Sequence, residues 1–240
     1  MAKFKKKNFT VIIPARGGSV EIKNKNLKNI NLRPLVAYSI NNALNSKLVG
    51  DTFVSTDSKR IAKISTKYGA KIILRPKHLG KSNSSIDDVV IHALNYLEKK
   101  KNFSIKNIVT LQPTSFFRSH KDIDNAIKFF ISKNADSLFS SVNIHPLFWM
   151  KTKKKLKPLN YLPTKRVNRQ KMKTYLIENG AIYITKKKIL QNINSRLGGK
   201  IVSYIMDSIS LLEIDTKQDL VLTKTLATKK VLKKINILKN

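Results

Sequence analysis

The sequence predicts an α/β fold built on a doubly wound, mostly parallel sheet. Short β-branched runs alternate with amphipathic helical patterns along most of the chain, which is typical of a parallel sheet covered by helices on both faces. The 240 residues suffice for one such domain with a full core, and 41% of them are hydrophobic. We therefore expect a single domain over residues 1–240.

The first half of the chain opens with a strand pattern over 9–13, followed by a loop. A helix is predicted near 34–44, where the opening proline suits the first helical position. The next strand is expected over 51–56, with Asp57 as the cap of a helix that ends at Gly69. Further strands are predicted over 71–74, 107–111, 137–142, 181–185 and 201–205.

Three later segments have helical patterns. Ser84 or Ser85 can cap a helix whose apolar residues over 86–97 form one continuous stripe. Apolar residues at helical spacing over 123–131 predict another helix, and the tail from Thr216 onward looks helical.

The alternation breaks over about residues 143–175. This stretch contains three of the seven prolines, the only tryptophan and a run of lysines. It is too long for an ordinary loop in a compact domain. We interpret it as an inserted arm, and a role in dimerisation would explain it.

Composition excludes several classes of protein. The chain has no cysteine, so disulfides and thiolate metal sites are excluded. The N-terminal lysines and the apolar run at 9–13 superficially resemble a signal peptide, but the run is short and enters Pro14 and Arg16 without a cleavage region. No apolar run is long enough for a membrane span. We expect a cytoplasmic protein that does not bind membranes.

The net charge of +34 raises a nucleic-acid-binding alternative. Only 8 of the 48 basic residues are arginine, and the lysines are scattered along every predicted element. This favours a solvated basic surface over an organised nucleic-acid site. An anionic nucleotide substrate would still benefit from the positive field.

A glycine-containing loop follows the first strand. Gly17 and Gly18 allow backbone amides to approach phosphate oxygens closely. Arg16 and Lys25 would neutralise a triphosphate. Taken alone, the two glycines could equally form a tight turn.

Glu213 and Asp215 occupy alternate positions, so in a strand both side chains would point to one face. Two adjacent carboxylates repel each other unless a cation lies between them. The alternative is a solvent-facing strand end with a helix cap at Asp215.

Matches to one enzyme family recur in order over nearly the whole chain. They are Pro14-Ala-Arg-Gly-Gly-Ser19 with Lys25-Asn26, Val54-Ser-Thr-Asp57, Leu74-Arg-Pro76, Ser84-Ser-Ile-Asp87, Leu111-Gln-Pro-Thr-Ser115 with Arg118, Arg169-Gln170, Glu178-Asn-Gly-Ala-Ile-Tyr-Ile184, and Glu213-Ile-Asp215 with Asp219. The sequence thus resembles the acylneuraminate cytidylyltransferases (CMP-sialic acid synthetases), a group that includes the legionaminic and pseudaminic acid enzymes. The resemblance implies a Rossmann-like nucleotidyltransferase fold, a Mg²⁺ cofactor and a homodimer.

The resemblance also implies roles for individual residues. Arg16 and Lys25 are the implied catalytic residues, and the metal ligands would be Glu213 and Asp215. The implied nucleotide-binding residues are Ala15, Arg16, Gly17, Gly18, Ser19, Lys25, Asn26, Arg75, Ser84 and Ser85. The implied substrate-binding residues are Gln112, Arg169 and Tyr183. Arg75 could instead be a strand-end charge, Arg169 a surface cation and Tyr183 a core residue.

Three positions depart from the family pattern. The family usually has Asp where this chain has Glu213, and Lys-Gly where it has Val20-Glu21. Either Lys23 supplies the missing cation, or the loop has drifted and binds nucleotide poorly. We favour compensation by Lys23.

The expected reaction joins CMP from CTP to the anomeric hydroxyl of an acidic nine-carbon sugar, with release of pyrophosphate. Such a transfer needs positioning and charge neutralisation more than covalent help from the protein. The partners would then be CTP and the sugar, not nucleic acid. A cytidylyltransferase for an eight-carbon acidic sugar is the alternative within enzymes, and a basic nucleic-acid-binding protein is the alternative of another class.

Overall fold

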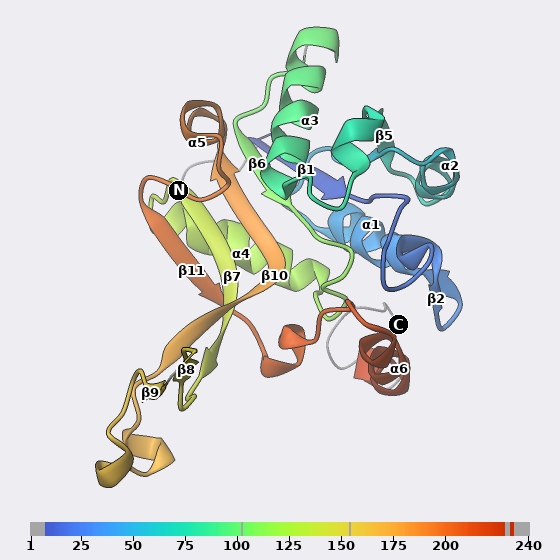
Figure 1. Cartoon of the computed structure of the whole chain (residues 1–240). Coiled ribbons are helices and arrows are strands. Elements are labelled where there is room, and N and C mark those ends of the chain that lie inside the picture. The colour runs from blue at the N-terminus through green and yellow to red at the C-terminus, as the bar shows by residue number, and fades with distance from the viewer. Residues whose placement is uncertain (1–7, 102, 154, 229–230, 233–240) are drawn as a thin grey trace.

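The structure is a computed structural model that describes residues 8–101, 103–153, 155–228 and 231–232. Its centre is a seven-stranded sheet with the strand order β11-β7-β10-β6-β1-β4-β5 (Figure 1). The strands are β1 (Phe9–Pro14), β4 (Thr52–Thr56), β5 (Lys71–Leu74), β6 (Asn107–Thr110), β7 (Ser137–Ile144), β10 (Tyr175–Lys186) and β11 (Ile201–Ile205). All pairings are parallel except those of β10, which runs antiparallel to both neighbours. The mostly parallel sheet predicted from the sequence is confirmed.

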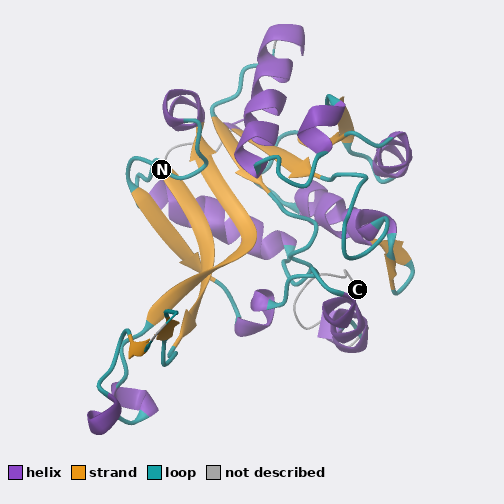
Figure 2. Ribbon diagram, in the orientation of Figure 1, coloured by secondary structure: helices purple, strands orange, loops and turns teal. Residues whose placement is uncertain are grey.

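Helices cover both faces of this sheet (Figure 2). They are α1 (Leu35–Asn45), α2 (Lys59–Lys67), α3 (Ile86–Lys101), α4 (His120–Ser132) and α5 (Lys187–Ile193). A sixth helix, α6 (Lys217–Leu226), packs in a separate apolar cluster with Leu35 and Ile214. Val11 and Ile13 of β1 pack in one core with α1 and α4, whereas Ile12 between them packs in a second core with α3. Successive strand residues point to opposite faces, so one apolar run fills both cores. None of the described helices is long and apolar enough to cross a bilayer.

The segment between β7 and β10 leaves the sheet and projects away from it (Figure 1). It contains the hairpin of β8 (Trp149–Lys151) and β9 (Leu156–Pro158), then two short 3₁₀ turns, η4 (Pro163–Lys165) and η5 (Arg169–Lys171). Phe148, Trp149 and Leu162 are among its exposed large apolar side chains. This segment corresponds to the predicted arm.

Three local expectations from the sequence differ from the structure. The cap of α2 is Ser58, whose hydroxyl accepts from the Ile61 amide, because Asp57 is turned toward the loop after β1 instead. Helix α1 begins one residue after Pro34. Strand β10 begins at Tyr175 and not at residue 181, because its first residues continue the ladder with β7 past a register shift.

The segment with Glu213 and Asp215 does not form a strand. It is a loop between η6 (Ser208–Leu211) and α6, and its Ile214 side chain is buried in a third apolar cluster. The Ile214 amide makes a single backbone hydrogen bond, to the Thr114 carbonyl at 3.1 Å. The side chains still alternate in direction. Ile214 is buried, whereas Glu213 and Asp215 line the cleft described below.

Candidate active site

Four neighbouring strands deliver polar residues to one edge of the sheet. The glycine loop follows β1, Asp57 follows β4, Arg75 follows β5 and Gln112 lies just past β6. Strand β1 pairs with β4 on one side and with β6 on the other, so the chain changes winding direction here. Loops at the carboxyl ends of strands beside such a switch point form a crevice in which open α/β sheets bind ligands.

The crevice is a cleft of about 300 Å³. It brings together most of the site residues that were predicted from the sequence. Those that line it are Arg16, Ser19, Lys25, Asn26, Arg75, Ser84, Ser85, Gln112, Glu213 and Asp215, and further lining residues include Lys81 and Thr114.

The glycine loop packs tightly against the end of β4. The Gly17 amide donates to Asp57 Oδ1 at 3.0 Å. A Cβ atom on Gly17 would lie 2.9 Å from Ser58 Cβ, so a side chain here would push the loop away. The Ser19 hydroxyl is buried without a hydrogen-bond partner in the described part of the chain. Buried hydroxyls usually have a hydrogen-bond partner, so the Ser19 hydroxyl is available to a ligand of the cleft.

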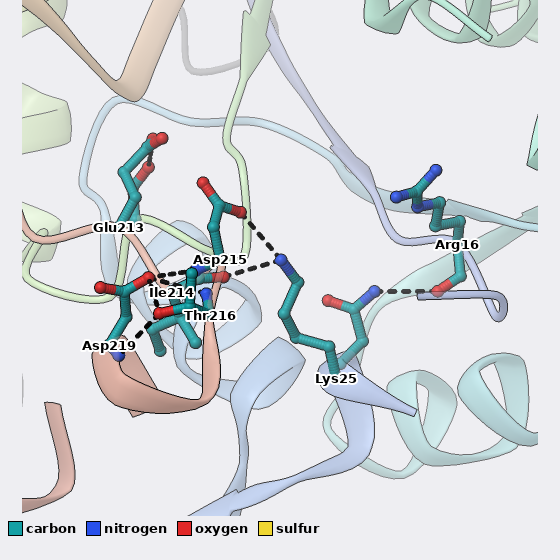
Figure 3. A network of polar contacts seen from close by, with 9 residues as sticks. Arg16, Lys25, Glu213, Ile214, Asp215, Thr216 and Asp219 are labelled. Atoms are coloured by element: carbon teal, nitrogen blue, oxygen red, sulfur yellow. Dashed lines mark hydrogen bonds and ion pairs between the residues drawn. The ribbon is translucent and has the colours of Figure 1, made fainter. Parts of the chain in front are cut away.

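Lys25 and Asn26 follow the loop in η2 (Lys25–Leu27). Lys25 Nζ donates to Asp215 Oδ1 at 2.9 Å and to the Ile214 carbonyl at 2.7 Å (Figure 3). Asn26 Nδ2 donates to the Arg16 carbonyl at 3.0 Å and fixes the start of the loop. Residues far apart in the sequence thus join the glycine loop to the carboxylate segment.

Asp57 is a residue whose place in the site the sequence did not reveal. Besides accepting from Gly17, its carboxylate lies 3.6 Å from Arg75 Nη2. The Arg75 side chain is only 3% exposed, and burial lowers its pKa while the Asp57 charge opposes that shift. Asp57 therefore positions both the glycine loop and a buried cation. Its place directly after a strand was the available signal.

Ser84 and Ser85 introduce α3 beside the cleft. Ser85 Oγ accepts from the Asp88 amide at 3.0 Å, so Ser85 caps the helix as the sequence allowed. Ser84 Oγ donates to the His78 carbonyl at 2.8 Å. Both residues also line the cleft, where they place polar atoms at the start of a helix.

Glu213 and Asp215 form the acidic wall of the cleft (Figure 3). Ser115 Oγ donates to Glu213 Oε1 at 2.8 Å. Burial raises the pKa of Glu213, the hydrogen bond from Ser115 opposes that effect, and the nearby Asp215 charge adds to it. Asp215 is more exposed and is paired with Lys25.

Arg118 is a buried residue behind the Gln112 side of the cleft, and no role was predicted for it from the sequence. Its Nη1 donates to the carbonyls of Gln112 at 3.2 Å and Ala181 at 2.7 Å, and its Nη2 donates to Ser39 Oγ at 2.6 Å. Complete burial lowers the pKa of Arg118 to about 10, so the guanidinium stays charged at neutral pH. It fixes the Gln112 loop to β10.

Five of the predicted site residues do not line the cleft. Ala15, Gly17 and Gly18 belong to the loop but expose no lining atoms. Tyr183 is buried, and its hydroxyl donates to Glu178 Oε2 at 2.8 Å while the Arg196 guanidinium lies 4.2 Å from its ring. Burial and then the bond to Glu178 raise the pKa of Tyr183. Arg169 is exposed in η5, on the projecting arm.

The acidic wall fits one kind of metal site. Among the described residues, no group of three or more His, Cys, Asp or Glu side chains could hold a metal ion. Mg²⁺, however, commonly takes one or two carboxylates and completes its shell with substrate phosphates and water. Glu213 and Asp215 supply two such donors. One Asp215 oxygen is paired with the Lys25 ammonium, which a bound metal ion would have to share or displace. The donors fit Mg²⁺ shared with a bound phosphate.

Comparison with known proteins shows the family to which the chain is similar. The model of the cytidylyltransferase family matches residues 10–237. The N-acylneuraminate cytidylyltransferase of Escherichia coli O18:K1:H7 (strain RS218 / NMEC) is 32% identical over 237 residues, which are 95% of this chain and 54% of that protein. The post-translational flagellin modification protein B of Campylobacter coli is 31% identical over 221 residues, covering 91% of this chain and 94% of that protein. The chain therefore spans about half the length of the first relative and nearly all of the second.

Solved structures share the fold at low sequence identity. The CMP:2-keto-3-deoxy-manno-octonic acid synthetase complexed with CTP superposes with a TM-score of 0.69 and 17% identity, covering 93% of this chain and 99% of that one. A 4-diphosphocytidyl-2C-methyl-D-erythritol synthase superposes with a TM-score of 0.66 and 10% identity, covering 92% of this chain and 99% of that one. These likenesses show that the chain shares their fold.

Proposed function

Because this chain belongs to the cytidylyltransferase family, we propose that it transfers CMP from CTP to an acidic nine-carbon sugar of the sialic acid type. The observation that carries the proposal is the cleft at the switch point of the sheet. There, a glycine loop with two cations lies opposite a pair of carboxylates that Lys25 joins to it. The cations suit an anionic nucleotide, and the carboxylates suit a metal-assisted phosphoryl transfer.

The triphosphate would be held by the glycine loop. Arg16 and Lys25 supply positive charge, and the unpartnered Ser19 hydroxyl supplies a donor. Arg75, Ser84 and Ser85 line the part of the cleft formed by the β5 end and the start of α3, where we place the cytosine. The buried Arg75 guanidinium is held in place by Asp57, so little side-chain entropy is lost when it binds a ligand.

The reaction is attack of the sugar's anomeric hydroxyl on the α-phosphorus. The bond from that phosphorus to the bridging oxygen breaks, the hydroxyl loses its proton, and pyrophosphate leaves. Mg²⁺, bound by Glu213 and Asp215, would neutralise charge on the phosphate oxygens. Gln112, beside this acidic wall, would position the sugar. We place the reaction in the cytoplasm, because its donor is a nucleoside triphosphate.

The sugar side is completed by a second copy of the chain. If Arg169 binds the sugar carboxylate, it does not do so in the cleft of its own chain, because it is exposed in η5 between β9 and β10 and does not line that cleft. The arm that contains β8 and β9 projects away from the sheet (Figure 1). An arm with exposed aromatic and aliphatic residues is suited to lie against another protomer. We therefore include a homodimer in the proposal, with Arg169 reaching the partner's cleft.

The test is pyrophosphate release from CTP in the presence of Mg²⁺ and single acidic sugars. The panel contains neuraminic, legionaminic and pseudaminic acid types and one eight-carbon acid. We expect turnover with at least one nine-carbon sugar, little with the eight-carbon acid, and none in excess chelator. Turnover confined to the eight-carbon acid would replace the nine-carbon proposal. Full turnover in excess chelator would show that the reaction needs no metal ion.

A further inference from the structure

The cationic side chains of the cleft differ in whether they are already neutralised. Arg16, Lys25, Arg75 and Lys81 all line it. Lys25 is paired with Asp215 at 2.9 Å, and Arg75 lies 3.6 Å from Asp57. Arg16 and Lys81 form no ion pair with any residue that the structure describes. Arg16 and Lys81 are thus the two cleft cations whose charge no described carboxylate offsets, and they add to the charge that Lys25 supplies.

Between Ser19 and Lys25, the glycine loop places no cation in the cleft. Val20 is 77% exposed, and Glu21 and Lys23 are exposed as well. None of the three lines the cleft. The structure does not place Lys23 where the compensation expected from the sequence requires it.

Lys81 comes from another loop, and its backbone is fixed beside Arg16. A Cβ atom on Gly80 would lie 2.5 Å from Asp57 Oδ2, so this glycine lets the chain pack closely on the end of β4. The Lys81 carbonyl accepts from the Ser84 amide at 3.3 Å and from Arg16 Nη1 at 3.4 Å. The side chain of Lys81 therefore starts from a defined point next to the loop that holds the phosphates.

We propose that Lys81 is a phosphate-binding residue that, with Arg16, neutralises the nucleoside triphosphate in this cleft. The inference rests on the proposed function in that it takes CTP as the ligand. A flexible ammonium on a fixed backbone is suited to a phosphate, which it binds as a point charge. It supplies from the loop before α3 the charge that Val20 and Glu21 do not supply from the glycine loop.

The experiment measures binding of CMP, CDP and CTP by calorimetry, without sugar, to the parent protein and to three variants. Lys81→Ala should weaken CTP binding by about 5–30-fold, affect CDP less and leave CMP nearly unchanged, because the lost contact is to the outer phosphates. Lys81→Arg should keep most of the CTP affinity, since it keeps the charge. Lys23→Ala is the matched control, and its affinities should equal those of the parent.

The outcomes separate the inference from the proposed function. A parent that prefers CTP over CMP, together with Lys81→Ala affinities unchanged for all three nucleotides, would overturn the role of Lys81 alone. An equal loss for CMP and CTP would also overturn it, because a phosphate contact must grow along the series. A parent that binds no cytidine nucleotide would overturn the proposed function, and the inference with it.

Discussion

Gly180 leaves the space in which the carboxylate of Glu213 lies. Its φ is +64°, a left-handed conformation that side chains rarely adopt. A Cβ atom here would lie 1.9 Å from Glu213 Oε1 and 3.1 Å from Gln112 Nε2. The conformation of one residue in β10 thus determines where two groups of the cleft can be.

Gly180→Ala should therefore reduce CTP turnover by at least 10-fold, because the methyl group displaces the Glu213 carboxylate. Strain from the left-handed backbone should also lower the free energy of unfolding by about 1–2 kcal/mol. Gly69→Ala is the matched control. Gly69 also has a positive φ of 88°, but the nearest neighbour of its Cβ is the flexible end of Leu44. Similar turnover losses in both variants would show that strain, not displacement of Glu213, is responsible.

The site residues that could be predicted from the sequence are those that belong to a short, recognisable motif. Ser19, Lys25 and Glu213 belong to this class, and the structure brings them to one cleft. Asp57 and Arg118 were not assigned to the site, because their roles depend on contacts with residues 40 or more positions away or with carbonyls across the sheet. Such partners are invisible until the strands are placed in order.

The start of α6 holds the acidic wall in position. Thr216 and Asp219 form a capping box, in which each side chain accepts from the other residue's amide. Asp219 Oδ2 also accepts from the Asp215 amide at 3.1 Å. The cap of this helix is therefore continuous with the backbone of a proposed metal ligand.

Asp219→Ala should lower the free energy of unfolding by about 0.5–2 kcal/mol, as loss of a helix cap usually does. It should also reduce turnover, because Asp215 loses its backbone anchor. Asp122→Ala removes the equivalent residue from the capping box of α4. It should cost similar stability with a smaller effect on turnover, which would separate anchoring of Asp215 from stability alone.

The stability contributed by Asp219 should depend on pH in a defined direction. Its hydrogen bond from the Thr216 amide, opposed by some burial, lowers the pKa of the carboxyl in the folded state. The contribution is therefore present above the unfolded pKa of about 3.9 and is lost as the pH falls through the folded pKa. Urea titrations of parent and Asp219→Ala should differ equally at pH 7 and pH 5, and the difference should shrink as the pH falls below about 3.9. A difference that stays constant from pH 5 to the lowest pH at which the parent is folded would contradict this assignment.

Hydrophobic runs predicted the bounds of most strands within one or two residues, and helical stripes located α1, α2, α3, α4 and α6. Helix α5 was not predicted. The first part of β10 was missed, because Tyr175 to Glu178 pair with β7 only after a register shift that no local pattern shows. Glu213 and Asp215 lie in a loop, and the helix cap considered at Asp215 is formed by Thr216 instead. The segment follows η6 and makes its single backbone contact with the Gln112 loop, so alternation there reflects the burial of Ile214 and not a ladder.

The charge of the whole molecule leads to a prediction about nucleic acid. A net charge of +34 will attract DNA at low salt, but scattered lysines form no organised site. Retention on random-sequence DNA should be weak and should disappear by roughly 0.2 M salt. Tight, sequence-selective binding near physiological salt would instead support the nucleic-acid-binding alternative.

The proposed dimer makes a prediction about complementation between protomers. Arg169→Ala and Asp215→Asn should each have little activity alone. When the two variants are mixed under conditions that exchange subunits, turnover should recover to about a quarter of the parent's, because half of the dimers are then mixed and each has one intact site. If Arg169 acts within its own chain, or not at the site at all, mixing will restore nothing beyond the average of the two variants.

If the proposed function is right, the protein transfers CMP, with the α-phosphorus of CTP, to an acidic sugar. Incubation with CTP labelled with ³²P at the α-phosphate, together with Mg²⁺ and the nine-carbon acids, tests it directly. We expect the label to appear in one new species that contains both CMP and the sugar, in step with the release of unlabelled pyrophosphate. Label that stays in CTP, or that appears only as free CMP with every sugar offered, would contradict it.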